Sequence, residues 1–197
     1  MQEELPELLV TDGCIYVAAS IDHPGCVRMT SNLLRVVFGV REPEAYRPEL
    51  EQIALDLRTG GVECFLSDNI RRDALMKFAY VSPQGACGLY YHIPAGGMQS
   101  AGEARECYIA LMEEIALLGK VMGVPLAEDY RERNLAVLDS LPPDMTTSLQ
   151  KDVAAGKQSE IDGLIFQVVR MGKQLGVHLP AYEKIAAKLS EKTVPLD

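Results

Sequence analysis

The sequence has no long apolar run, and its first residues, MQEELPELL, are acidic. A membrane-spanning helix needs roughly 20 mostly apolar residues, and a secretory signal peptide joins a basic start to an apolar stretch. We therefore expect no membrane span and no secretory leader. The default expectation is a soluble cytoplasmic protein.

Basic charge is also scarce. The chain has 19 Lys and Arg against 28 Asp and Glu, which gives a net charge of −9 and a pI near 4.9. Binding to nucleic acid depends on clustered Lys and Arg that neutralise phosphates. The composition argues against a nucleic-acid partner, and the acidic surface favours solubility.

Metal-ligating residues are few and scattered. The chain has three His and five Cys, and the cysteines are odd in number with no CxxC pair. This pattern indicates neither a disulfide framework nor a zinc site, so buried free thiols are expected. His178 lies just past a predicted helix end, where a capping or solvent role is commoner than catalysis.

The chain also lacks the glycine fingerprint of dinucleotide-binding proteins. That fingerprint, Gly-x-Gly-x-x-Gly, lies between a strand and a helix and lets the backbone approach a pyrophosphate. The glycine clusters at Gly60-Gly61, Gly85-x-x-Gly88 and Gly96-Gly97 have neither the spacing nor the preceding strand. No pyrophosphate site is predicted within this chain.

What is present is enough to fold. With 197 residues and 48% hydrophobic content, the chain has the size of one domain or a domain and a half. Residues 14–19 and 33–38 are rich in β-branched and aromatic residues and are predicted strands, with a turn at 22–25. A short amphipathic helix over 49–58 and a strand over 62–66 follow.

The rest of the sequence is predicted to be helical. A helix starting at Ser67 or Asp68 carries Lys77 and is expected to be interrupted at Pro83 and Gly85. The further predicted helices span 102–123, 129–141, 147–155, 159–175 and 179–192.

Residues 146–180 are the most informative stretch. Thr146 or Thr147 can cap a helix that Gly156 ends, and Ser159 can cap the next, with Asp162 offsetting the helix dipole. Gly176 suits a left-handed C-cap. Ser148 and Glu160 thus stand at two successive helix starts, where their side chains can converge on one cleft.

This stretch resembles a known family. The run SLQKDVAAGKQSEIDGL is similar to the C-terminal helical domain of the ketopantoate reductases (2-dehydropantoate 2-reductases), whose pattern is a Ser, then LQD and a small basic turn, then TEID. Residue by residue, the resemblance puts the substrate-binding Ser on Ser148 and the substrate-binding Glu on Glu160. It covers roughly Asp12 to the C-terminus.

A second motif of the family, Trp-x-Lys in a helix, resembles Leu75-Met76-Lys77 and puts the catalytic Lys on Lys77. The chain departs from the pattern elsewhere. Val81 and Gly85 stand where the family often has Asn, Leu75 replaces the Trp, and Ile165-Phe166 replace an Asn-Gly pair. Lost amides mean fewer hydrogen bonds to a keto acid.

Each of the three residues also has a purely structural interpretation. A helical lysine commonly lays its stem along the core and keeps its ammonium in water. Ser148 can satisfy first-turn amides, and Glu160 can compensate a helix dipole. Their joint agreement with the two motifs favours a site in which Lys77, its pKa lowered by desolvation, donates a proton to a substrate carbonyl.

The resemblance implies a mainly α protein. An all-helical C-terminal domain at 67–197, like that of 6-phosphogluconate dehydrogenase, would follow a short β/α remnant of a Rossmann-type domain at 1–66. It also implies NADPH-dependent reduction of a 2-keto acid to a 2-hydroxy acid, in pantothenate biosynthesis if the substrate is ketopantoate.

The missing fingerprint leaves three explanations. The chain is a truncated product, it pairs with a separate nucleotide-binding chain, or it has lost catalysis. The first is the most economical, because the Lys, Ser and Glu positions remain. This chain alone is expected to be inactive, and the alternative is a non-catalytic helical module for dimerisation or binding.

Overall fold

The computed structural model describes residues 8–191, except for the side chain of Thr30. These residues form two compact units, one through Ala74 and the other from Leu75. A short strand and helix region precedes an all-helical region, so the predicted fold class is confirmed. The domain boundary after residue 66 stays a prediction.

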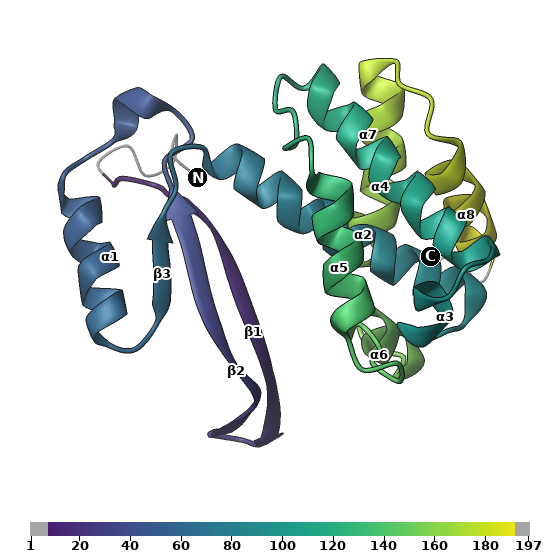
Figure 1. The fold of residues 1–197 in the computed structure, drawn as a ribbon, viewed down its shortest axis with the longest axis horizontal. Coiled ribbons are helices and arrows are strands. Elements are labelled where there is room, and N and C mark those ends of the chain that lie inside the picture. The colour runs from purple at the N-terminus through teal and green to yellow at the C-terminus, as the bar shows by residue number, and fades with distance from the viewer. Residues whose placement is uncertain (1–7, 192–197) are drawn as a thin grey trace. The chain divides into compact units, whose positions relative to one another are not determined.

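The first unit is built on a three-stranded sheet (Figure 1). Strand β1 (Asp12–His23) pairs antiparallel with β2 (Cys26–Gly39), and β2 pairs parallel with β3 (Glu63–Leu66). A 3₁₀ turn (Pro43–Ala45) and helix α1 (Glu49–Thr59) connect β2 to β3. The predicted turn at 22–25 is present, but both strands of the hairpin continue almost to it.

Helix α1 covers only part of one sheet face. Its buried Leu50 and Ala54 pack with Phe38 and Cys64 of the sheet. On the same face, Ile15 of β1 lies opposite Val36 in the strand pairing, because directly opposite residues share a face. Ile15 is 56% exposed, which leaves the β1 side of this face uncovered.

The second unit contains the C-terminal part of α2 (Ile70–Tyr91) and six further helices. These are α3 (Gly96–Gln99), α4 (Glu103–Val121), α5 (Tyr130–Ser140), α6 (Ser148–Ala154), α7 (Gln167–Leu175) and α8 (Pro180–Ser190). One core joins them, and its fully buried residues include Tyr108, Leu111 and Met112 of α4 and Tyr182 and Ile185 of α8. Position Lys192, in the predicted last helix, lies outside the described residues.

The predicted interruption of α2 is wrong. Pro83 lies inside an uninterrupted helix. A proline has no N–H, so it leaves the carbonyl four residues earlier, that of Ala79, without its helical partner. The buried Asn134 of α5 supplies one instead, since its Nδ2 donates to the Ala79 carbonyl at 3.3 Å. A side chain distant in sequence thus stabilises the proline-containing turn.

The start of the predicted helix at 159 also differs. Ser159 caps nothing, and the helix opens with a π-helical turn, Asp162–Phe166, before α7 begins. Asp162 forms a two-bond ion pair with Arg170, at 2.7 and 2.9 Å, instead of reaching back to the first amides. Gly176, with φ 68°, is the left-handed C-cap that the sequence predicts.

Across residues 8–191, no helix combines the length and apolar content that crossing a membrane requires.

Candidate functional site

Ser148 is the first residue of α6, and the residue before it is the helix cap. The Thr147 hydroxyl accepts from the Gln150 amide at 3.2 Å, and the Gln150 side chain accepts from the Thr147 amide at 3.0 Å. This reciprocal capping box satisfies two donors that the helix start leaves open. Thr147 therefore does the capping, and the exposed Ser148 side chain does not act as the cap.

Two glycines of α2 let α6 approach closely. A Cβ at Gly85 would lie 2.9 Å from a terminal methyl of Leu149, and a Cβ at Gly88 would lie 2.6 Å from Cδ of Gln150. Gln150 also donates to the Ile93 carbonyl at 2.9 Å. The segment that carries Ser148 is therefore fixed against the second half of α2.

Glu160 lies in the turn directly before the π-helical segment, and its side chain is exposed. Its carbonyl accepts from the Leu164 amide at 2.9 Å. The Leu164 carbonyl in turn accepts from the Ser82 hydroxyl of α2 at 2.5 Å. Single π-helical turns are rare in proteins overall, and those that occur are often found at functional sites. The π-helical start after Glu160 is therefore consistent with a site at this turn.

Ser82 is itself held from the other side. The buried Tyr182 hydroxyl of α8 lies 2.5 Å from the Ser82 hydroxyl, which lets Ser82 accept from Tyr182 while donating to Leu164. Burial raises the pKa of Tyr182, so the phenol keeps its proton for this bond. The chain of bonds ties the turn after Glu160 to α2 and α8.

Lys77 is a partly buried residue of α2. At a helical rise of about 1.5 Å per residue, it lies roughly 7.5 Å along the axis from Ser82 and roughly 12 Å from Gly85. The segments carrying Ser148 and Glu160 contact α2 at these two points. Helix α2 thus carries Lys77 and contacts the segments that carry Ser148 and Glu160. Contact among the Lys77, Ser148 and Glu160 side chains themselves stays a prediction.

A hollow of about 540 Å³ opens beside these segments in the helical unit. It is mostly apolar, with Lys151 and His92 as its titratable members, and none of its described lining residues is Lys77, Ser148 or Glu160. Its lining residues are Gly88, Leu89, His92, Thr146, Gln150, Lys151, Val153, Ala154, Ile161 and Leu189.

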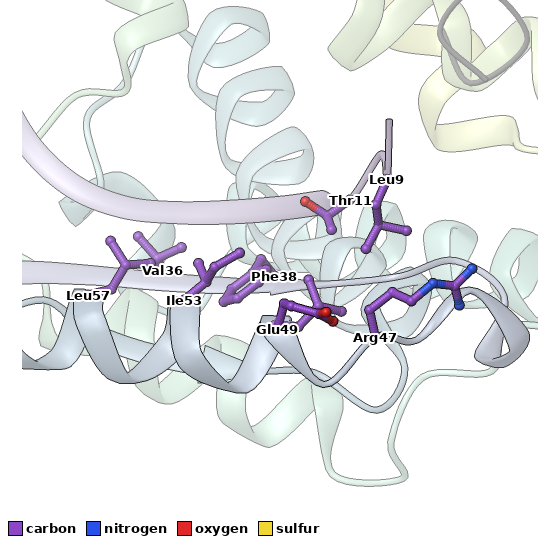
Figure 2. Close-up of a pocket in the computed structure, with 9 residues that line it drawn as sticks. Leu9, Thr11, Val36, Phe38, Arg47, Glu49, Ile53 and Leu57 are labelled. Atoms are coloured by element: carbon purple, nitrogen blue, oxygen red, sulfur yellow. The ribbon is translucent and has the colours of Figure 1, made fainter. Parts of the chain in front are cut away.

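A second hollow, of about 490 Å³, lies in the first unit between α1 and the sheet (Figure 2). Figure 2 shows Ile53 and Leu57 of α1 beside Val36 and Phe38 of β2, with Arg47 and Glu49 toward one end. We call this hollow the α1 groove; its remaining lining residues are Leu9, Thr11 and Leu50.

Among residues 8–74, the turn from β3 into α2 is already filled by the chain's own side chains. This turn is the natural place for a dinucleotide pyrophosphate, since phosphates bind where a strand leads into a helix start. There the Ser67 hydroxyl donates to Asp73 at 2.6 Å and accepts from the Asn69 amide at 3.0 Å. A carboxylate already occupies this turn.

Within residues 8–191, no cluster of His, Cys, Asp or Glu is arranged to hold a metal ion.

Several residues at the site were not predicted from the sequence. Ser82, Tyr182 and Asn134 position the turns around α2, yet each is an ordinary helical residue in the pattern. Pro83 is the one sequence feature that points to a residue such as Asn134. A proline within a helix has no N–H, so the carbonyl four residues earlier needs a donor from elsewhere. Ser82 and Tyr182 are 100 positions apart, and no local pattern links them.

The family model "Ketopantoate reductase PanE/ApbA C terminal" matches residues 69–193. An uncharacterized oxidoreductase of Bacillus subtilis, YkpB, is 26% identical over 183 residues, which cover 91% of this chain and 59% of the relative. The chain therefore spans well under two thirds of this curated relative.

Solved structures share the fold. The 2-dehydropantoate 2-reductase of Methylococcus capsulatus matches with a TM-score of 0.84 at 22% identity, covering 99% of this chain and 63% of that one. The ternary structure of D-mandelate dehydrogenase with NADH and anilino(oxo)acetate matches with a TM-score of 0.81 at 18% identity, covering 98% and 64%. Both matches extend over the two units of the chain.

Proposed function

We propose, since the chain belongs to the ketopantoate reductase family, that it forms the substrate-binding part of an NADPH-dependent oxidoreductase. The reaction would convert a 2-keto acid into a 2-hydroxy acid. The observation that carries the proposal is that the family match over 69–193 contains Lys77, Ser148 and Glu160, the three residues of the two motifs.

In this proposal Lys77 acts on the ketone oxygen. An ammonium aimed at that oxygen stabilises the negative charge that develops when hydride reaches the carbonyl carbon, and it then gives the oxygen a proton. The partly buried position of Lys77 supports this role, because a Coulomb interaction is stronger where water is excluded.

Ser148 and Glu160 would hold the substrate. The Ser148 hydroxyl donates to the substrate carboxylate, and the Glu160 carboxylate accepts from a substrate hydroxyl. Thr147 already caps α6, which leaves Ser148 available for a ligand. The Ser82 bond to Leu164 fixes the turn that carries Glu160.

The substrate is a 2-keto acid, with ketopantoate as the first candidate and pantothenate biosynthesis in the cytoplasm as the corresponding role. The chain has Val81 and Gly85 where the family often has Asn. An Asn at 85 would collide with Leu149, because even a Cβ there lies 2.9 Å from its methyl. The loss of these amides favours substrates that need fewer polar contacts.

The nicotinamide nucleotide would be held by a completing domain. The described residues provide no pyrophosphate turn, whereas the D-mandelate dehydrogenase relative contains NADH and is longer than this chain.

The α1 groove and the uncovered β1 face expose Leu9, Ile15 and Ile53. Exposed apolar side chains beside an apolar groove are typical of an interaction surface, so we propose that the completing domain covers them.

The test is reduction of a panel of 2-keto acids, including ketopantoate, by the full-length gene product with NADPH and with NADH. We expect turnover of at least one branched 2-keto acid, with NADPH as the better donor. Replacing Ser148 by Ala and Glu160 by Gln should raise KM more than it lowers kcat. Absence of turnover with every keto acid, in a product that binds NADPH, would favour the non-catalytic helical module instead.

A further inference from the structure

Two cysteines of the helical unit lie on facing turns of α2 and α4. Cys87 of α2 is fully buried, and the partly exposed Cys107 of α4 packs against the core that contains it. The Cys87 thiol donates to the Ala104 carbonyl at 3.3 Å, one turn before Cys107 on α4. Neither sulfur is in a disulfide.

A second contact sets the register of the two helices. One turn along α2 from Cys87, the Tyr91 hydroxyl donates to Glu103 at 3.0 Å, and Glu103 is one turn before Cys107 on α4. Residues four apart share a helix face, so the two pairs form successive contacts between the same faces. The thiols are therefore held together by packing around them.

The surroundings distinguish the two sulfurs. The neighbouring Cys87 thiol, and further the Tyr91 hydroxyl and the Lys184 ammonium, lower the pKa of Cys107, against the opposing effects of burial and Glu103. The neighbouring Cys107 thiol and burial raise the pKa of Cys87. Cys107 is thus the sulfur of the pair that ionises more readily, and it is also the more accessible one.

We propose that Cys87 and Cys107 form a peroxide-reactive pair that closes reversibly into an intramolecular disulfide. The Cys107 thiolate attacks one peroxide oxygen, the O–O bond breaks, and hydroxide leaves while Cys107 becomes a sulfenic acid. The Cys87 sulfur then attacks the Cys107 sulfur, the S–O bond breaks, and the Cys87 proton leaves with the oxygen as water. Both thiols are oxidised, the peroxide is reduced to two waters, and a small-molecule thiol reverses the bond by exchange.

Cys64 and Cys26 lie in the first unit and differ from this pair. Cys64 is buried in the first unit, and burial raises its pKa, which disfavours the reactive thiolate. Cys26 is partly exposed at the start of β2. It therefore serves as a matched control that is accessible but lies in the other unit. The proposal does not depend on the reductase function.

The 197-residue chain is treated with a small excess of hydrogen peroxide, alkylated and digested with trypsin. Cleavage after Lys77, Arg105 and Lys120 leaves each cysteine of the pair in its own peptide, 78–105 and 106–120. We expect these peptides to be crosslinked, with a mass two hydrogens below their sum, and to separate on reduction. The oxidised chain should melt about 5–10 °C higher, because the crosslink restricts the unfolded chain.

Variants separate this chemistry from general oxidation. Cys107→Ser should abolish the crosslink, Cys87→Ser should leave a sulfenic acid at position 107 that a cyclic dione traps, and Cys26→Ser should behave like the unaltered chain. Circular dichroism and a parallel Cys87→Ala variant guard against misfolding. Oxidation of Cys107 to a sulfinic acid without any crosslink in the unaltered chain would overturn the proposal, as would equal crosslinking in Cys107→Ser.

Discussion

Pro83 is accommodated in α2 by a single side chain from another helix. Asn134 donates to the carbonyl that the proline leaves without a partner, and both groups are buried. A buried carbonyl without a partner is costly, so one amide on α5 decides whether this turn of α2 is stable. This turn, from Ala79 to Pro83, follows Lys77 along α2 and contains Ser82.

Replacing Asn134 by Ala should therefore lower the free energy of unfolding by about 1–3 kcal/mol. In a Pro83→Ala background the loss should be smaller, because the alanine amide at 83 can bond to the Ala79 carbonyl within the helix. Urea unfolding of the two single variants and the double variant measures this coupling. Equal losses in both backgrounds would mean that Asn134 stabilises the chain in some other way.

Glu114 is a buried residue of α4 whose carboxylate binds the first amides of another helix, α8. Its two oxygens accept from the Ala181 amide at 2.7 Å and from the Tyr182 amide at 3.0 Å, at the start of α8. Burial raises the pKa of Glu114, and these two amide bonds counteract the effect only in part. The folded chain therefore binds the Glu114 proton more tightly than the unfolded chain does.

The sign of the pH effect follows from linkage. The contribution of Glu114 to stability is complete below its unfolded pKa of about 4.5 and is lost as pH rises through its higher folded pKa. We expect the unfolding free energy of the unaltered chain, measured relative to Glu114→Gln, to increase when pH is lowered from about 7 to about 5. A relative stability that falls over this range would show that the folded state favours the ionised carboxylate.

Helix α6 positions Ser148 through its cap. Thr147→Ala removes the hydroxyl that accepts the Gln150 amide, and we expect it to cost about 1 kcal/mol of stability. The neighbouring Thr146→Ala has no role in the capping box and should change stability by less than about 0.5 kcal/mol. Chemical denaturation of both variants makes the comparison. A larger loss of stability for Thr146→Ala than for Thr147→Ala would show that Thr147 is not the residue that caps α6.

Element by element, the sequence predicts most of the helices because their signals are local. Thr147 and Gly176 are at helix ends with the residue types that caps require, and the hairpin turn at 22–25 has Pro and Gly. The uninterrupted α2 and the π-helical turn were not predictable in this way. Both depend on partners far along the chain, Asn134 for the first and Ser82 for the second.

The candidate site shows the same division. The motif residues Lys77, Ser148 and Glu160 can be proposed from the resemblance of their two motifs to the family pattern, and two of their segments are found fixed to the helix that carries Lys77. The residues that fix these segments, Gly88 and Ser82, carry no signal in a single sequence. Their roles depend on contacts with Gln150 and Leu164 that only the fold reveals.

At the scale of the whole molecule, the α1 groove predicts an interface. Ile53 lines it and is 47% exposed, whereas Leu55 on the same helix is 52% exposed and does not line it. Ile53→Asp should lower the melting temperature of the full-length product more than that of the 197-residue chain, because a buried unpaired charge is costly. Leu55→Asp should change both proteins equally. If Ile53→Asp lowered the melting temperatures of the two proteins equally, the α1 groove would not be covered by a completing domain.

The central claim is that Lys77 is the proton donor of a keto acid reductase. Its most direct test is kcat for reduction of the best keto acid by the full-length product, compared with Lys77→Ala and with Lys120→Ala, an exposed lysine of α4. We predict that Lys77→Ala lowers kcat by about 10²- to 10⁴-fold with unchanged circular dichroism, while Lys120→Ala retains full turnover. A Lys77→Ala enzyme with the kcat of the unaltered protein would contradict the account.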